Sequence, residues 1–101
     1  MHERLQEALR EAAAEFLARE AGRQSLVTVT RAQLSENDKR ATIFLTVMPE
    51  SAEESAVEFA NRNRKEFADF FGTRVRGARA PHITFMIDRG EKNRQRLDEL
   101  S

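Results

Sequence analysis

Apolar side chains in the first twenty residues recur at intervals of three and four positions. This spacing matches one face of a helix and predicts an amphipathic helix from Glu3 to Ala21. Gly22 follows at the position where a left-handed residue commonly ends a helix. The residues expected on the buried face are Leu5, Ala8, Leu9, Ala12, Phe16 and Leu17.

The apolar period then changes to two. Residues 25–34 alternate Val with Thr, and the run from Arg40 to Met48 alternates in the same way, so both segments are predicted to be strands. Turn-forming residues separate them, which indicates a hairpin. The turn residues are Ser35, Asn37 and Asp38, and the second strand is expected to bury Ile43, Leu45 and Val47.

A long helical stretch is predicted after Pro49, which stops the strand. Ser51 and Glu54 form a capping-box pattern at its start, and the stretch reaches roughly Gly72. Weak helix formers and clustered charge at residues 61–65 predict two helices or one bent helix. The apolar stripe consists of Ala56, Phe59, Ala60, Phe67 and either Phe70 or Phe71.

A third strand is predicted from His82 to Asp88, after an irregular basic segment bracketed by Gly77 and Pro81. The charged tail at residues 89–101 predicts a short surface helix or a frayed end. The side chains of the third strand expected to point inward are Ile83, Phe85 and Ile87.

The predicted order is helix, strand, strand, helix, helix, strand. It indicates an α+β fold in which helices cover one face of a three-stranded sheet, the layout of a KH-like domain of the bacterial type, type II. With 101 residues, the chain has enough surface to bury for one core, so we expect a single domain over residues 1–101.

Composition narrows the class of protein further. Hydrophobic residues make up 40% and charged residues 34%, which is typical of a folded soluble domain. No apolar run approaches a membrane span or a signal peptide, and the absence of cysteine excludes disulfides and thiolate sites. We therefore expect a cytoplasmic monomer without a membrane partner.

Charge is balanced overall but not locally. The net charge is 0, yet residues 62–79 hold six basic and two acidic side chains, an excess of +4. Arginine presents planar, always-charged donors suited to phosphate oxygens. The predicted RNA-binding residues are therefore Arg62, Arg64, Lys65, Arg74, Arg76 and Arg79. The alternative is that they form an ordinary solvated surface.

Few residues offer catalytic or metal chemistry. Neither His2 nor His82 has a recognisable partner, and His82 and Asp88 are separated by about 20 Å of strand. We expect no catalytic residue, no metal, no cofactor and no small-molecule substrate. The backbone-clamping GxxG loop of ordinary KH domains is also missing, because Gly72 and Gly77 stand five apart. Phe44 is expected either to stack on a base or, as the favoured alternative, to lie under the C-terminal helix.

Several ordered segments resemble the ribosome-binding factor A family. They are Val27-Thr28-Val29-Thr30-Arg31, Ser35 before the turn, Ala41 to Val47, and Pro81 to Asp88. The similarity extends from the first helix to Leu100. It implies a KH-like, non-catalytic factor that associates with the immature small (30S) ribosomal subunit, assists late 16S rRNA maturation and processing, and supports growth in the cold.

The chain departs from the family at the helix kink. The family has Ala-x-Gly there, whereas this sequence has Asn63-Arg64-Lys65, which adds charge where the family meets RNA. An alternative function is a protein-interaction module that uses the exposed sheet face or Phe70 and Phe71. An enzyme is the third and least favoured class.

Overall fold

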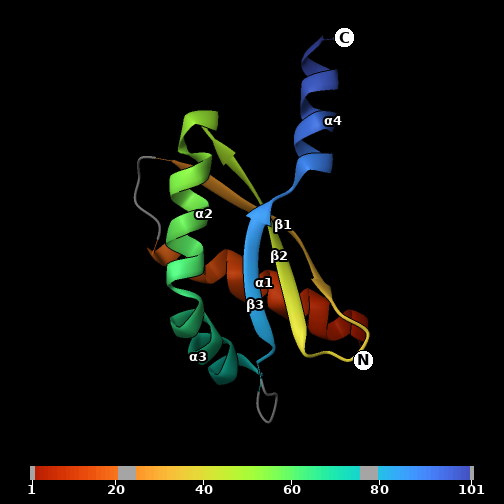
Figure 1. Cartoon of the computed structure of the whole chain (residues 1–101), viewed down its shortest axis with the longest axis vertical. Helices are drawn as coiled ribbons and strands as arrows, with labels where there is room; N and C mark the ends of the chain where they lie inside the picture. Colours follow the sequence, from red (N-terminus) through yellow and green to blue (C-terminus); the bar gives the residue numbers. More distant parts are fainter. Residues whose placement is uncertain (1, 21–24, 76–79, 101) are drawn as a thin grey trace.

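The computed structural model describes residues 2–20, 25–75 and 80–100. Residues 2, 99 and 100 are described by their backbone only. The elements follow the predicted order, with a single 3-10 turn inserted (Figure 1). The α+β class is therefore confirmed, and the C-terminal tail forms a helix. The elements are α1 (His2–Glu20), β1 (Leu26–Leu34), β2 (Arg40–Met48), η1 (Glu50–Ala52), α2 (Glu53–Arg62), α3 (Arg64–Arg74), β3 (His82–Ile87) and α4 (Arg89–Leu100).

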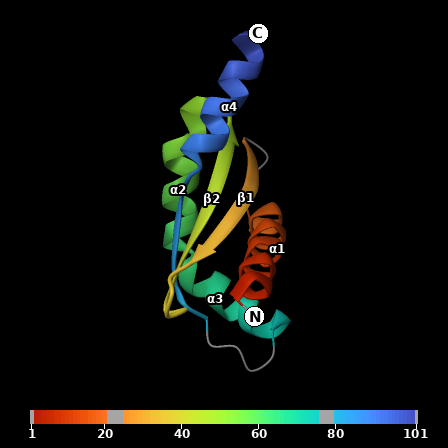
Figure 2. The ribbon, with the colours of Figure 1, turned by 90° about the vertical axis from the view of Figure 1, so that its right-hand side faces the viewer.

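The three strands form one sheet in the order β1-β2-β3. β1 and β2 pair antiparallel as the predicted hairpin, whereas β3 returns parallel to β2 after the two helices. α1 contacts β1 and α2 contacts β3, and α1 crosses behind the strands in Figure 1. The quarter turn in Figure 2 shows α4 projecting beyond the end of the sheet. The sheet therefore has one face under helices and one open face.

The covered face holds the hydrophobic core. Ile43 and Leu45 on the central strand are fully buried, as predicted. Phenylalanine rings join the sheet to the helices, with ring centroids 5.6 Å apart for Phe16 and Phe67 and 5.7 Å apart for Phe67 and Phe85. Both pairs meet edge to face, the arrangement that the ring quadrupole favours. α1, α3 and β3 are thus fixed to one another at Phe67.

A β-bulge at Thr30 changes which residues of β1 face the core. Val29 pairs with Leu45 and Arg31 pairs with Phe44, so Thr30 is the extra residue. Val29 and Ala32, three positions apart, are both buried as a result. The bulge places Arg31 on the open face, opposite Phe44.

The predicted capping box at Ser51 is wrong. η1 stands between Pro49 and α2, with the Ala52 amide donating to the Pro49 carbonyl at 2.9 Å, and no side chain caps either helix. The 3-10 turn moves the start of the α-helix to Glu53 and leaves Ser51 exposed. The expected end of the first helix at Gly22 lies outside the described residues.

The predicted interruption of the long helical stretch occurs at Asn63, which separates α2 from α3. Two residues earlier, the Asn61 amide binds the outer edge of β3. Its Nδ2 donates to the Phe85 carbonyl at 3.0 Å, and its Oδ1 accepts from the Phe85 amide at 2.8 Å. Asn61 thereby satisfies backbone groups that a further strand would otherwise pair.

Replacing Asn61 with leucine is expected to lower the free energy of unfolding by about 2 kcal/mol, because the partly buried amide and carbonyl of Phe85 lose their partners. Urea unfolding followed by circular dichroism measures this change. Asn93→Leu on the exposed surface of α4 is the control and should stay within roughly 0.5 kcal/mol of the parent. Equal stability of the two variants would contradict a structural role for Asn61.

Candidate nucleic-acid interface

Three of the predicted RNA-binding residues flank the helix break. Arg62 ends α2, and Arg64 and Lys65 begin α3, all three exposed or partly exposed. Arg64 is held in place, since its Nε donates to the Asn61 carbonyl at 3.0 Å. In the part of the chain that the structure describes, neither Arg62 nor Lys65 forms an ion pair. The break therefore offers uncompensated positive charge.

Arg74 lies at the opposite end of α3 and is already engaged. It forms an ion pair with Glu15 of α1, and its guanidinium lies 4.9 Å from the centroid of the Phe70 ring. These contacts join α3 to α1, so any phosphate must compete with a carboxylate for Arg74. Arg76 and Arg79 lie outside the described residues.

The sequence suggests Phe70 and Phe71 as contacts for a partner protein, and for Phe71 this is wrong. Phe71 is fully buried, because its position on α3 turns the ring toward Phe67 in the core. Phe70 is half-buried beside Phe16, with the guanidinium of Arg19 5.9 Å from its ring.

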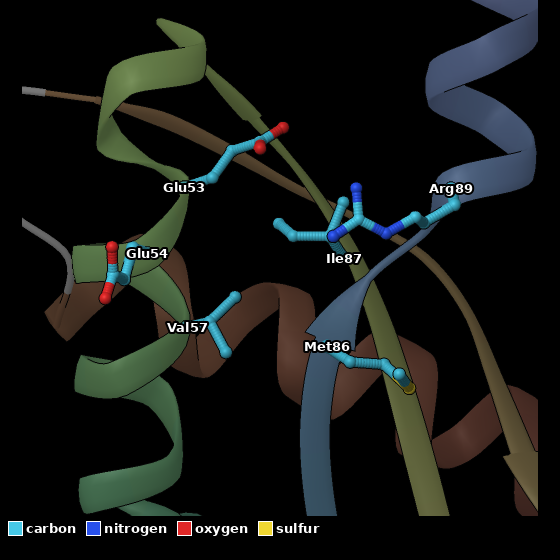
Figure 3. Close-up of a pocket in the computed structure, with 6 residues that line it drawn as sticks. All are labelled: Glu53, Glu54, Val57, Met86, Ile87 and Arg89. Atoms are coloured by element: carbon cyan, nitrogen blue, oxygen red, sulfur yellow. The ribbon is translucent and has the colours of Figure 1, made fainter.

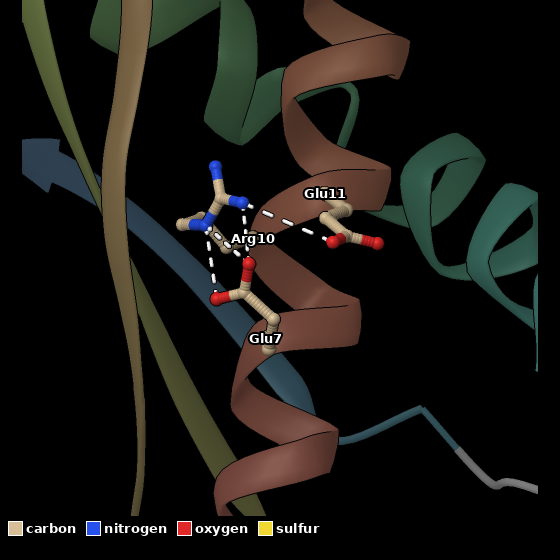
Figure 4. Close-up of polar contacts among 3 residues, drawn as sticks. All are labelled: Glu7, Arg10 and Glu11. Atoms are coloured by element: carbon tan, nitrogen blue, oxygen red, sulfur yellow. Dashed lines mark hydrogen bonds and ion pairs between the residues drawn. The ribbon is translucent and has the colours of Figure 1, made fainter.

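A basic residue of α1 is compensated within its own helix (Figure 4). The Nε of Arg10 lies 3.1 Å from both carboxylate oxygens of Glu7, and its Nη2 lies 4.0 Å from the Glu11 carboxylate. The hydrogen bond from Arg10 holds the pKa of Glu7 below its ordinary value. This part of α1 therefore presents balanced charge rather than a cation for phosphate.

Phe44 lies on the open sheet face and is half-buried. The guanidinium of Arg31 on the neighbouring strand lies 4.0 Å from the centroid of its ring. Arg31 therefore covers the Phe44 ring. The sequence suggested base stacking or burial under the C-terminal helix, and neither prediction included this contact. On the other side, Phe44 is paired with Met86 of β3, which is exposed.

A buried carboxylate, Asp88, joins this face to α4. It accepts hydrogen bonds from the Thr30 hydroxyl at 2.6 Å and from the Glu91 amide at 3.0 Å, and Arg31 Nε lies 3.4 Å away. Burial alone raises the pKa of Asp88, but these hydrogen bonds and the charge of Arg31 outweigh it and lower the pKa. Asp88 thus caps α4 and pins it to the bulge in β1.

A groove of about 340 Å³ lies between the start of α2 and the end of β3 (Figure 3). Val57, Met86 and Ile87 give it an apolar lining, Glu53 and Glu54 stand on its α2 side, and Arg89 stands at the start of α4. Glu53 is paired with Lys92 at 3.1 Å, so the groove presents the Glu54 carboxylate and the Arg89 guanidinium and has no excess of positive charge for a phosphate backbone. The groove is consequently a poorer RNA site than the helix break.

No group of three or more His, Asp or Glu side chains among residues 2–20, 25–75 and 80–100 could hold a metal ion. No helix within these ranges is both long and apolar enough to span a bilayer.

Comparison with known proteins gave one family and several structures. The family model described as Ribosome-binding factor A matches residues 1–101, whereas no curated protein matches. The crystal structure of ribosome-binding factor A from Thermus thermophilus is 24% identical with a TM-score of 0.77, and the match covers 88% of this chain and 98% of that one.

A second structure is a homology model of the Thermus thermophilus ribosome binding factor A, fitted into a cryo-EM map of its complex with the 30S subunit. It is 25% identical with a TM-score of 0.74, and the match covers 85% of this chain and 93% of that one. The predicted KH-like fold is confirmed by these likenesses.

The Asp88 contacts generate a prediction for the dependence of stability on pH. A carboxyl whose folded-state pKa is lowered stabilises the fold above its unfolded pKa of about 3.9, and this contribution disappears as pH falls through the folded value. Asp88→Asn should therefore lower the melting temperature at neutral pH and reduce its decline below about pH 4. Thermal unfolding across a pH series measures both effects, and parallel curves for the two proteins would contradict the assignment.

Proposed function

This chain belongs to the ribosome-binding factor A family, and we propose that it binds the immature small ribosomal subunit in the cytoplasm. There it assists late maturation and end processing of 16S rRNA, without catalysis, and then dissociates. The proposal is supported above all by the family match over residues 1–101 and by the related Thermus protein fitted on the 30S subunit.

The helix break is the proposed centre of the RNA contact. Arg62, Arg64 and Lys65 supply positive charge there. Arg76 and Arg79, which follow α3 in the sequence, extend the contact, and Arg74 joins it by exchanging Glu15 for a phosphate. Phosphate contacts of this kind position a protein on RNA without reading its sequence. Selectivity then comes from the shape of the assembling particle.

The helix break would bind phosphate through side chains, unlike the GxxG loop of ordinary KH domains, which clamps the RNA backbone. Arg64 is anchored to the Asn61 carbonyl, and Asn61 is itself bound to β3, so the guanidinium has a rigid support. A supported arginine loses less conformational entropy on binding phosphate than a free one. We therefore assign Arg64 the central phosphate contact.

A protein-interaction module remains the second candidate. Met86 is exposed on the open sheet face, and Leu26 and Met48, which pair at the end of the sheet, are exposed too. An apolar interface would be nearly insensitive to salt, whereas phosphate contacts weaken steeply as salt rises. The salt dependence of subunit binding separates the two.

Reversing the charge of Arg62 and Lys65 to Glu is expected to weaken binding to immature small subunits roughly tenfold and to reduce the salt slope by about 2. Co-sedimentation across a salt series measures both quantities. The control reverses Arg89 and Arg94 on α4, which changes net charge equally and should bind like the parent. Parent-like binding and slope for the Arg62 and Lys65 variant would contradict the proposed contact.

Growth gives a second readout of the same variant. In cells that depend on this chain, the Arg62→Glu, Lys65→Glu protein should slow growth most at low temperature, where RNA rearrangements are slowest, with precursor 16S rRNA accumulating. Normal precursor levels in the cold would contradict the role in late maturation.

A further inference from the structure

Two segments distant in sequence, residues 39–42 and 82–84, meet at the hairpin end of the open sheet face. Arg40 at the start of β2 pairs in register with His82 at the start of β3, and the next outward pair is Thr42 with Thr84. The His82 amide also donates to the Lys39 carbonyl at 2.9 Å. The parallel pairing of β2 and β3 thus gathers residues that lie far apart along the chain.

These residues surround a hollow of about 510 Å³. Its lining consists of Lys39, Arg40, Ala41, Thr42, His82 and Thr84. The acidic residues of the neighbouring turn, Glu36 and Asp38, are not part of the lining, so no carboxylate of the described residues lines the hollow. An anion inside would meet an ammonium, a guanidinium and two hydroxyl groups, all of which donate hydrogen bonds.

His82 supplies a further donor. Its Nε2 lies 3.4 Å from the Arg64 guanidinium, which has hydrogens to donate and no acceptor. A neutral imidazole in this contact accepts at Nε2 and therefore has its hydrogen on Nδ1. The contact with Arg64 thus favours the tautomer with a ring N–H at Nδ1, which can donate to an anion.

The same contact joins the hollow to the helix break. Arg64 lies between Arg62 and Lys65 on one side and the start of β3 on the other. Positive groups consequently continue from the break, around the edge of the sheet, to Arg40 and Lys39 on the open face. In the described part of the chain, no ion pair neutralises Arg62, Lys65, Lys39 or Arg40.

We propose that this hollow is a second phosphate-binding subsite, which holds the backbone of the same RNA strand that contacts the helix break. The inference rests on the proposed function and extends its interface to residues outside the basic segment at 62–79. The fork of Arg40 and the flanking threonine hydroxyls suit the tetrahedral oxygens of a phosphodiester. The strand then follows one continuous basic path rather than lying along α3 alone.

The first test is nuclear magnetic resonance of the full chain with a short single-stranded RNA. The amides of Arg40, Thr42, His82 and Thr84 should shift together with those at residues 62–65. Shifts confined to residues 62–65 would overturn the second subsite.

The second test is the salt dependence of that RNA's affinity. Lys39→Gln with Arg40→Gln should reduce the slope by about 1.4, because each lost phosphate contact on a single strand removes roughly 0.7. The affinity should fall roughly fivefold to tenfold. Arg89→Gln with Arg94→Gln on α4 removes the same charge and should leave the slope unchanged. An equal loss in both variants would overturn a localised site.

The outcomes also separate this inference from the proposed function. If the parent binds immature subunits and the Lys39 and Arg40 variant keeps the full slope, the subsite is wrong and the function stands. If the parent binds no subunit but RNA shifts the hairpin end, the function is wrong and the subsite stands. A third outcome is that the Lys39 and Arg40 variant loses subunit binding while RNA shifts no amide resonance at the hairpin end. The hollow would then bind an acidic protein segment, and the proposed RNA subsite would be overturned.

Discussion

The fold depends on one constraint: its helices cover a single face of a three-stranded sheet. α1, α2 and α3 bury the side chains that point from β2 toward them, and the opposite face stays in contact with solvent. The outer edge of β3 cannot pair with another strand at Phe85, because the Asn61 amide occupies both of its backbone groups there. Asn61 also lies in the last turn of α2, so the outer edge of β3 and the helix break at Asn63 lie next to each other.

This arrangement explains how a chain of zero net charge can bind RNA. Several cations are compensated within the fold, among them Arg10 by Glu7, Arg74 by Glu15, and Lys92 by Glu50 at 2.6 Å and Glu53 at 3.1 Å. The cations near the break and the hairpin end have no such partners among the described residues. The local charge is therefore positive where RNA is proposed to lie, although the sum over the chain is zero.

Periodicity predicted most of the fold, because the exposed and buried faces of each element have different polarity. β2 was predicted with its observed ends, and the weak helix formers around Asn63 indicated the break. The bulge at Thr30 was missed because the Val and Thr alternation was extended past it, although the apolar positions shift there from Val27 and Val29 to Ala32 and Leu34. Pairing with β2 shows that Thr30 is the extra residue. Ser51 and Glu54 predicted the wrong helix start because a 3-10 turn can hold the same pattern.

The candidate site was only partly visible in the sequence. Arg62, Arg64 and Lys65 are neighbours along the chain, so their cluster was evident. Lys39, Arg40 and His82 are brought together only by the parallel return of β3, and no spacing rule predicts that register. Nor could composition show that Glu15 neutralises Arg74, which removes one predicted cation from the free surface.

The most direct test of the account is directed hydroxyl-radical probing of immature small subunits, because the chain has no cysteine and one can be introduced at any position. Iron–EDTA would be attached at Glu66→Cys beside the helix break, at Glu36→Cys in the hairpin turn, or at Asn93→Cys on α4. We expect cleavage of 16S rRNA from the first two positions, at neighbouring nucleotides, and little from the third. Cleavage from Asn93→Cys alone would contradict this expectation and place the RNA on another face of the molecule.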